Sequence, residues 1–280
     1  MEYITLNEGW TPLHCAVSYG HEDLVRLLLK FVKNKHPKVK SDGYSPLHLC
    51  SKEGFLFIAK CFFETKKLVK LPKDKQGKTP LHMAASRDQR GLVKFLLENI
   101  KENCPRDKSG LTPLHSAAEN GHFETIKLLM DNLKEKNPED QHGFTPLHKA
   151  AEKGYLKIVE YILEFIDDKN PKNSNNWTPL HEAAYNGHLS IVKYIISNVK
   201  GDKNPESNGK WTPLKYAAYK GHTEIVDYIT KVISVQEENN NMSIRTRSQK
   251  RALEVVKNVT PTKSGDDDFV HQKSKKKKNN

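Results

Sequence analysis

The chain carries the stretch Trp177-Thr178-Pro179-Leu180-His181-Glu182-Ala183-Ala184-Tyr185-Asn186-Gly187-His188 and repeats it, with substitutions, along most of its length. The core reads Thr-Pro-Leu-His at 11–14, 79–82, 112–115, 145–148 and 178–181, Ser-Pro-Leu-His at 45–48 and Thr-Pro-Leu-Lys at 212–215. These seven copies start 33 or 34 residues apart. A period held this tightly predicts a repeat array rather than one globular domain with scattered motifs.

Each copy has the composition of a helix start. Thr178 is suited to the N-cap position, and Pro179 to the first helical position, where a missing N–H costs nothing. His181 is placed to reach back to the Thr178 backbone, as Glu or Gln does in a capping box. The following Ala-Ala pair keeps the helix thin, so that neighbouring repeats can approach closely, and Gly187 is suited to end the helix.

A second amphipathic helix is expected after each Gly-His pair. In the sixth copy its apolar residues recur on one face of a 3.6-residue period, at Ile191, Val192, Ile195, Ile196 and Val199. Segments rich in Asp, Asn, Gly and Pro, such as 168–171, separate the copies and have the composition of turns.

A turn, a helix beginning Thr-Pro-Leu-His, an Ala-Ala pair, Gly-His and a second helix on this period together resemble the ankyrin repeat family. The resemblance covers residues 1–236. It implies an all-α ankyrin-repeat solenoid of antiparallel helix pairs with projecting turn-hairpins, and a role in binding other proteins. We expect residues 1–236 to form the ankyrin repeat domain, and 237–280 to be a polar linker followed by a disordered basic tail.

Three copies depart from the pattern. The second has Phe57 at a usually exposed position, which indicates either local repacking or an apolar contact point on the convex side. The third has Asp88-Gln89 where Gly-His is expected, so the end of its first helix should be strained. In the seventh, Lys215 replaces the motif histidine and cannot accept the same hydrogen bonds, which favours a C-terminal capping repeat.

The composition limits the class of protein. The net charge is +12, and residues 243–280 hold 11 Lys/Arg against 4 Asp/Glu, so the tail is more basic than the repeats. The sequence has no signal-peptide pattern and no apolar run long enough for a transmembrane helix. We therefore expect a monomeric intracellular protein, nuclear or cytoplasmic, without membrane contact. Its cysteines should be reduced and form no metal spacing; they are Cys15, Cys50, Cys61 and Cys104.

The histidines invite a metal-site hypothesis, which geometry disfavours. Stacked helices lie about 8–10 Å apart, whereas each ligand must come within about 2.1 Å of one Zn²⁺. The periodic histidines are therefore expected to be structural. No phosphate-binding loop, nucleophile elbow or catalytic acid pair is recognised, so we expect a non-enzyme without cofactor or metal. The motif histidines are His14, His48, His82, His115, His148 and His181.

Binding residues are expected where the repeats differ. The residue before each Thr or Ser is aromatic in five of the seven copies, and the resemblance places this junction on the concave face. A second aromatic column stands just before the Gly-His pair. Such side chains dominate interface hot spots, although they can instead pack on the neighbouring hairpin. The candidates are Trp177, Trp211, Tyr185, Tyr219, Phe144, Tyr44, Trp10 and Tyr19.

The leading hypothesis is thus a scaffold or adaptor that binds a protein through its concave face, with the positive charge favouring an acidic partner. The tail resembles a nuclear localisation signal at Lys273, Lys275, Lys276, Lys277 and Lys278; alternatively it is a solvated lysine-rich end. A nucleic-acid-associated protein whose tail contacts phosphates is the alternative function. A spacer without a defined partner is the third.

Overall fold

The computed structural model describes residues 9–64 and 70–258. The described residues form fourteen helices and no strand, which confirms the expected all-α fold. Each repeat contributes a short inner helix and an outer helix. The inner helices are α1 (Pro12–Ser18), α3 (Pro46–Glu53), α5 (Pro80–Ser86), α7 (Pro113–Glu119), α9 (Pro146–Lys153), α11 (Pro179–Tyr185) and α13 (Pro213–Lys220). The outer helices are α2 (Glu22–Phe31), α4 (Leu56–Glu64), α6 (Arg90–Asn99), α8 (Phe123–Asn132), α10 (Leu156–Glu164), α12 (Leu189–Asn198) and α14 (Thr223–Asn258).

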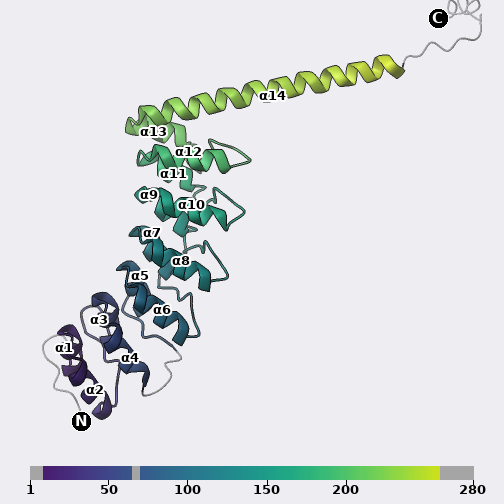
Figure 1. Cartoon of the computed structure of the whole chain (residues 1–280). Helices are drawn as coiled ribbons and strands as arrows, with labels where there is room; N and C mark the ends of the chain where they lie inside the picture. Colours follow the sequence, from purple (N-terminus) through teal and green to yellow (C-terminus); the bar gives the residue numbers. More distant parts are fainter. Residues whose placement is uncertain (1–8, 65–69, 259–280) are drawn as a thin grey trace, which may run out of the picture. The chain divides into compact units, whose positions relative to one another are not determined.

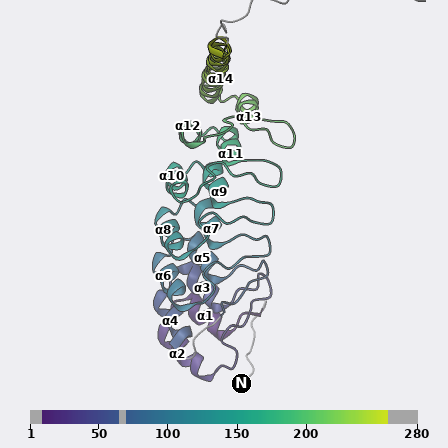
Figure 2. The same ribbon diagram turned by 90° about the vertical axis from the view of Figure 1, so that its right-hand side faces the viewer.

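The helices of Met1–Lys231 stack in two rows. Each inner helix packs on the inner helix of the next repeat from α1 to α13, and the outer helices pack in the same order from α2 to α12. Figure 1 shows these pairs following one another in chain order, and Figure 2 shows the loops projecting on one side of the stack. This arrangement confirms the expected ankyrin solenoid.

The inner helices begin as the motif predicts. Thr178 has an extended backbone, and its hydroxyl accepts a hydrogen bond from the His181 N–H at 3.4 Å. In return, the Thr178 N–H donates to His181 Nδ1 at 3.1 Å. Two backbone donors at the start of the helix are thereby satisfied within four residues. The same reciprocal pair forms in each of the six copies that have the histidine.

The second nitrogen of each motif histidine ties one repeat to the next. His181 Nε2 lies 3.2 Å from the carbonyl oxygen of Trp211, the residue just before the following motif. Because a carbonyl can only accept, Nε2 carries the proton and Nδ1 is the acceptor. The remaining pairs are His14 with Tyr44, His48 with Lys78, His82 with Leu111, His115 with Phe144 and His148 with Trp177.

The core lies between the two rows and between successive repeats. Leu180 and both residues of the Ala183-Ala184 pair are fully buried. On the outer helix α12, the expected apolar face is buried at Ile191 and Ile195. A side chain larger than alanine at position 183 or 184 would displace the adjacent helix, because buried positions tolerate little added volume.

Four of the projecting hairpins, at 74–78, 107–111, 140–144 and 173–177, are built around an Asp or Asn. The Asp140 carboxylate accepts from the backbone N–H groups of His142 and Phe144, and Asn173 holds its own turn in the same way. Neighbouring hairpins are joined by backbone hydrogen bonds such as Ser174 N to His142 O at 2.9 Å. The loops therefore continue the stacking that the helices set.

Two of the three irregular copies, the third and the seventh, differ locally as the sequence indicates. Asp88 takes a left-handed φ of +54°, which costs a non-glycine residue conformational energy. Its carboxylate accepts hydrogen bonds from Thr125 Oγ1 at 2.8 Å and from Arg90 Nε at 3.1 Å. In the seventh repeat, Lys215 Nζ donates to the Lys210 carbonyl oxygen, so the reciprocal histidine pair is replaced by a different bond.

The chain divides into two compact units, Met1–Lys231 and Val232–Asn280. Helix α14 begins in the first unit as the outer helix of the seventh repeat, where Ile225 and Ile229 are buried. It continues through the second unit to Asn258, so residues 237–241, where we expected a polar linker, are helical. The sequence from 222 to 258 contains no Gly or Pro, so nothing in it breaks a helix.

The histidine network predicts a pH dependence of stability. Burial lowers the pKa of His82, His115, His148 and His181 to about 4, against backbone hydrogen bonds that oppose the shift. An unfolded histidine takes up a proton below its ordinary pKa of 6.5, whereas these folded ones stay neutral until about pH 4. The free energy of unfolding is therefore highest above pH 6.5. It decreases as the pH falls toward 4, by up to about 1.4 kcal/mol per pH unit for each of these histidines.

Urea unfolding of the full chain between pH 7 and 4.5, followed by circular dichroism, measures this slope. H148Q should lower this slope by the equivalent of about one proton bound on unfolding. H142Q, which removes an exposed imidazole on a hairpin tip, serves as the matched control and should leave it unchanged. An equal slope for H148Q and the parent chain would contradict the role assigned to the buried imidazoles.

Two equivalent glycines allow the cost of a strained backbone to be measured separately from the cost of a steric clash. Gly187 and Gly221 occupy the same place in successive repeats, with φ of +82° and +76°. A Cβ at 187 would lie 2.7 Å from the His222 ring, whereas a Cβ at 221 meets nothing within 4 Å. Both G187A and G221A should lose about 1 kcal/mol to the left-handed backbone, and only G187A should lose more. Thermal unfolding of the two variants tests this, and equal losses would show that the histidine ring moves aside freely.

Candidate functional site

The junction aromatics lie against the motif histidine of their own repeat. The Trp177 ring stacks on the His181 ring with centroids 5.0 Å apart. The backbone carbonyl of every junction residue after Trp10 accepts a hydrogen bond from the motif histidine of the preceding repeat. The histidine network therefore fixes the position of each of these junction residues. The other ring contacts of this kind are Trp10 with His14, Tyr44 with His48 and Phe144 with His148, at 5.5–5.7 Å.

The structure brings four of the candidate aromatics together with a further ring, that of Tyr216. Tyr216 lies 4.6 Å from Trp177, 4.9 Å from Trp211 and 5.8 Å from Tyr185, between ring centroids. Tyr219 contacts Trp211 edge-to-face at 5.8 Å. We call Trp177, Tyr185, Trp211, Tyr216 and Tyr219 the aromatic cluster. Its rings come from the inner helices and junctions of two adjacent repeats.

The aromatic cluster is unevenly accessible. Tyr219 is 71% exposed and Trp211 39% exposed, while Trp177, Tyr185 and Tyr216 are partly buried. Lys220 Nζ lies 4.3 Å from the centroid of the Tyr185 ring, within the range of a cation–π contact. The cluster therefore presents both apolar surface and a ring that already attracts a cation.

Tyr216 was missed by the sequence reasoning. It stands directly after the fourth motif residue, in a column that also holds Lys149 and Glu182 and differs in every repeat. That variability was the available signal, because a framework position would not change so freely. The remaining candidates, Phe144, Tyr44, Trp10 and Tyr19, make no ring contact with the aromatic cluster in the described part of the chain.

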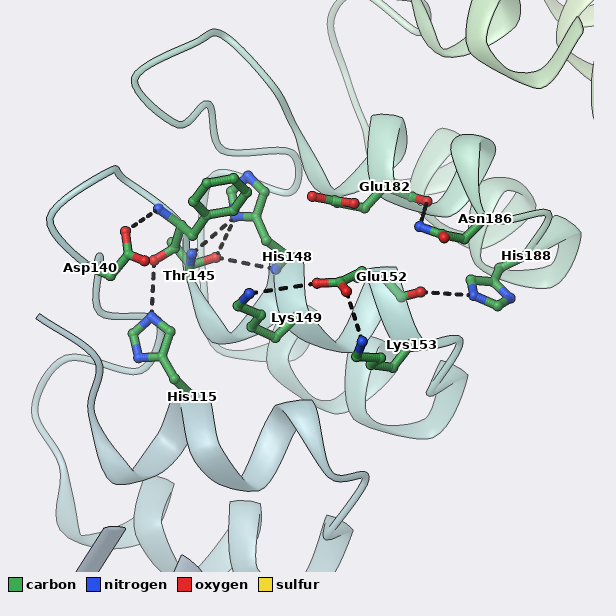
Figure 3. Close-up of polar contacts among 11 residues, drawn as sticks. His115, Asp140, Thr145, His148, Lys149, Glu152, Lys153, Glu182, Asn186 and His188 are labelled. Carbon is green, nitrogen blue, oxygen red and sulfur yellow. Dashed lines mark hydrogen bonds and ion pairs between the residues drawn. The ribbon is translucent and has the colours of Figure 1, made fainter. Parts of the chain in front are cut away.

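A partly buried carboxyl group accompanies the cluster. Burial raises the pKa of Glu182 to about 7, and the nearby negative charge of Glu152 adds to the shift. Glu152 itself has a lowered pKa, because its bonds to Lys153 at 2.8 Å and Lys149 at 3.6 Å outweigh the effect of burial. Figure 3 shows the two carboxylates on adjacent inner helices and the two lysines on the Glu152 side.

The motif histidines have no free ring nitrogen for chemistry. In each motif histidine both ring nitrogens are hydrogen-bonded within the framework. Three histidines of the Gly-His pairs, His122, His188 and His222, each bond a backbone carbonyl of the preceding repeat at 3.0 Å. Among the residues with described positions, no group of three or more His, Cys, Asp or Glu side chains is arranged to hold a metal ion.

The outer face has its own exposed ring. Phe57 is 65% exposed, with Lys60 Nζ 5.4 Å from its centroid. Phe62 is buried in the core, and Phe63 packs edge-to-face on Phe95. The irregular second repeat thus places its extra aromatics both inside and outside.

A hollow in the described part of the chain lies away from the aromatic cluster, none of whose residues lines it. It has a volume of about 890 Å³ and opens between the loops at 167–172 and 198–202. Asp168, Lys169, Lys200 and Asp202 line it, so charges of both signs are mixed along its walls. Lys169 Nζ donates to the Ile166 carbonyl oxygen at 2.6 Å, which gives it a structural role at the end of α10.

Two further expectations concern the rest of the chain. The lysines of the nuclear-signal-like segment, at 273 and 275–278, lie outside the described residues. Across 9–64 and 70–258, no helix combines the length and the apolar character that crossing a membrane requires.

Comparison with known proteins gives partial matches to several proteins. The chain is 32% identical over 102 residues to the probable 26S proteasome regulatory subunit p28 of Saccharomyces cerevisiae, covering 34% of this chain and 44% of that protein. It is 39% identical over 79 residues to ankyrin repeat and SOCS box protein 16 of Homo sapiens, covering 28% and 17%. It is 30% identical over 99 residues to alpha-latrotoxin-Lg1a of Latrodectus geometricus, covering 34% and 7%. The matched segments span less than half the length of each of these relatives.

The family comparison covers most of the chain. The profile described as ankyrin repeats in three copies matches residues 2–67, 31–107, 92–173 and 165–241. These matches agree with the helix pairs and with the motif period. The chain belongs to the ankyrin repeat family, whose repeats are in general non-catalytic modules for protein–protein interaction.

Proposed function

We propose that this protein is a non-enzymatic scaffold or adaptor that binds a partner protein through the inner-helix face, with the aromatic cluster as its anchor. The observation that carries this proposal is the contact of five rings across two adjacent repeats, with Tyr219 and Trp211 exposed. Aromatic side chains bury large areas at low conformational cost and dominate interface hot spots.

The charge around the cluster supports an acidic partner. Exposed lysines lie on the last inner helix and the junction before it, at Lys210, Lys215 and Lys220. Charges of one sign at the rim of an interface steer a partner of the opposite sign and raise the association rate. We expect the protein to act as a monomer toward this partner.

The motif histidines support a non-enzymatic role. A general base needs a free ring nitrogen close to its proton donor. In all six motif histidines the acceptor nitrogen faces a Thr or Ser N–H, and the donor nitrogen faces a carbonyl of the next repeat. Repeated use of one residue in one role is what a scaffold requires.

The basic tail supports a second function, contact with nucleic acid. Its excess of lysine and arginine over 243–280 would neutralise phosphates without reading sequence. In the adaptor proposal the same lysines act as a nuclear address, and the protein works in the nucleus or the cytoplasm.

The test is affinity capture from nuclease-treated extract, with mass spectrometry, on four full-length proteins. W211A/Y219A should lower capture of its specific partners at least about ten-fold, because hot-spot truncations cost more than about 1.4 kcal/mol. The matched control, F57A/F165A, removes two exposed rings from the outer face and should change nothing. Circular dichroism confirms that each variant folds.

The fourth protein carries glutamine at Lys273, Lys275, Lys276, Lys277 and Lys278. Partners that survive this change and are lost in W211A/Y219A support the aromatic anchor. Capture that appears only when the nuclease is omitted, is lost with the lysines, falls steeply with salt and is insensitive to W211A/Y219A would contradict the adaptor and favour the nucleic-acid function.

A further inference from the structure

One carboxyl group at the aromatic cluster forms no ion pair of its own, although the charges of Lys149 and Lys153 act on it. Glu182 lies on α11, three residues before Tyr185, so the two side chains are neighbours on the helix surface. Within the described residues no ion pair reaches its carboxylate. Figure 3 shows Glu152 engaged by two lysines, whereas the bond drawn at Glu182 is the one that its backbone carbonyl accepts from the Asn186 side chain.

The Trp177 indole does not satisfy this carboxyl group. A hydrogen-bonding contribution from Trp177 lowers the pKa of Glu182, but the indole Nε1 is buried and no acceptor lies within hydrogen-bond geometry of it. An ionised carboxylate that is partly removed from water, without a matching cation, is unfavourable. A protein retains such a group at little cost only if it is neutral or is paired when a ligand binds.

The rings around the carboxyl group favour a cation. The Trp177 and Tyr185 centroids are 6.2 Å apart, and Tyr216 closes the group from the next repeat. Lys220 already crosses from α13 to place its ammonium over the Tyr185 ring at 4.3 Å. Aromatic faces beside a carboxylate are the environment that attracts a guanidinium or ammonium group.

We propose that Glu182, flanked by Trp177 and Tyr185, is a subsite for one positively charged side chain, arginine or lysine, of the partner protein. The inference rests on the proposed function, because it assigns one contact within the interface that the aromatic cluster anchors. It is compatible with an acidic partner: the lysines steer the whole molecule, whereas Glu182 selects a single basic residue and so fixes its register.

Binding of a cation should be linked to pH. The charged groups around Glu182 are Lys149, Glu152 and Lys153 from α9 and Lys220 from α13, with Tyr216 beside them. Burial and Glu152 place the pKa of Glu182 at about 7. The ionised fraction, and with it the affinity for a cation, should therefore rise about ten-fold from pH 6 to pH 8.

The test uses the full chain and small probes. N-acetyl-arginine amide and N-acetyl-lysine amide are titrated at pH 8, and N-acetyl-citrulline amide is the neutral control of the same shape. The indole N–H signal of Trp177 in a ¹⁵N-correlated spectrum, assigned with W177F, reports binding. We expect saturable shifts with either or both cations and none with citrulline.

Variants make the test specific. E182Q should weaken binding at least ten-fold and abolish its pH dependence. E164Q, which removes an exposed carboxylate from α10, should match the parent chain. K220Q should strengthen binding, because it removes a competing cation. Equal affinity for citrulline, or unchanged binding by E182Q, would overturn the inference.

Failure here is distinguishable from failure of the proposed function. If W211A/Y219A loses its partners while E182Q keeps them with unchanged affinity, the adaptor stands and the cation subsite is wrong. If E182Q and W211A/Y219A both leave partner capture unchanged, the proposed anchor itself is wrong.

Discussion

The fold depends on a neutral imidazole with two fixed partners. In each of the first six repeats, Nδ1 accepts from the Thr or Ser that starts the helix, and Nε2 donates to the carbonyl of the junction before the next helix. One side chain therefore completes a helix cap and sets the register between repeats. Protonation would place a second donor against the N-cap N–H, so the interaction needs the neutral form that burial enforces.

This network also decides where recognition side chains can stand. The carbonyl that accepts from the histidine belongs to the junction residue, so its backbone is immobilised while its side chain is free to vary. Tyr44 and Trp177 lie against the neighbouring imidazole, whereas Lys78 and Leu111 stand in the same position in other repeats. A rigid acceptor with a variable side chain lets one framework support different binding surfaces.

Much of this could be read from the sequence, because repeats bring equivalent residues to equivalent places. The Thr-Pro-Leu-His caps, the buried Ala183-Ala184 pair and the grouping of Trp177 with Tyr185 all follow from position within the period. Tyr216 and Glu182 did not, since their importance depends on which side chains face each other across two repeats. The helix over 237–241 was also not expected, because polar composition was taken to indicate a linker although no residue there breaks a helix.

The exposure of the aromatic cluster follows from where the histidine network stops. Trp177 is partly covered because α13 packs beyond it, and Tyr216 supplies the ring that closes the contact. Trp211 stands in the same column, but its own repeat has Lys215 in place of the imidazole, and the lysine bonds a carbonyl within the same repeat. No described inner helix follows α13 to cover Trp211 and Tyr219. Aromatic rings of the kind that α13 partly covers at Trp177 are therefore presented on the surface at Trp211 and Tyr219, near a carboxyl group that forms no ion pair.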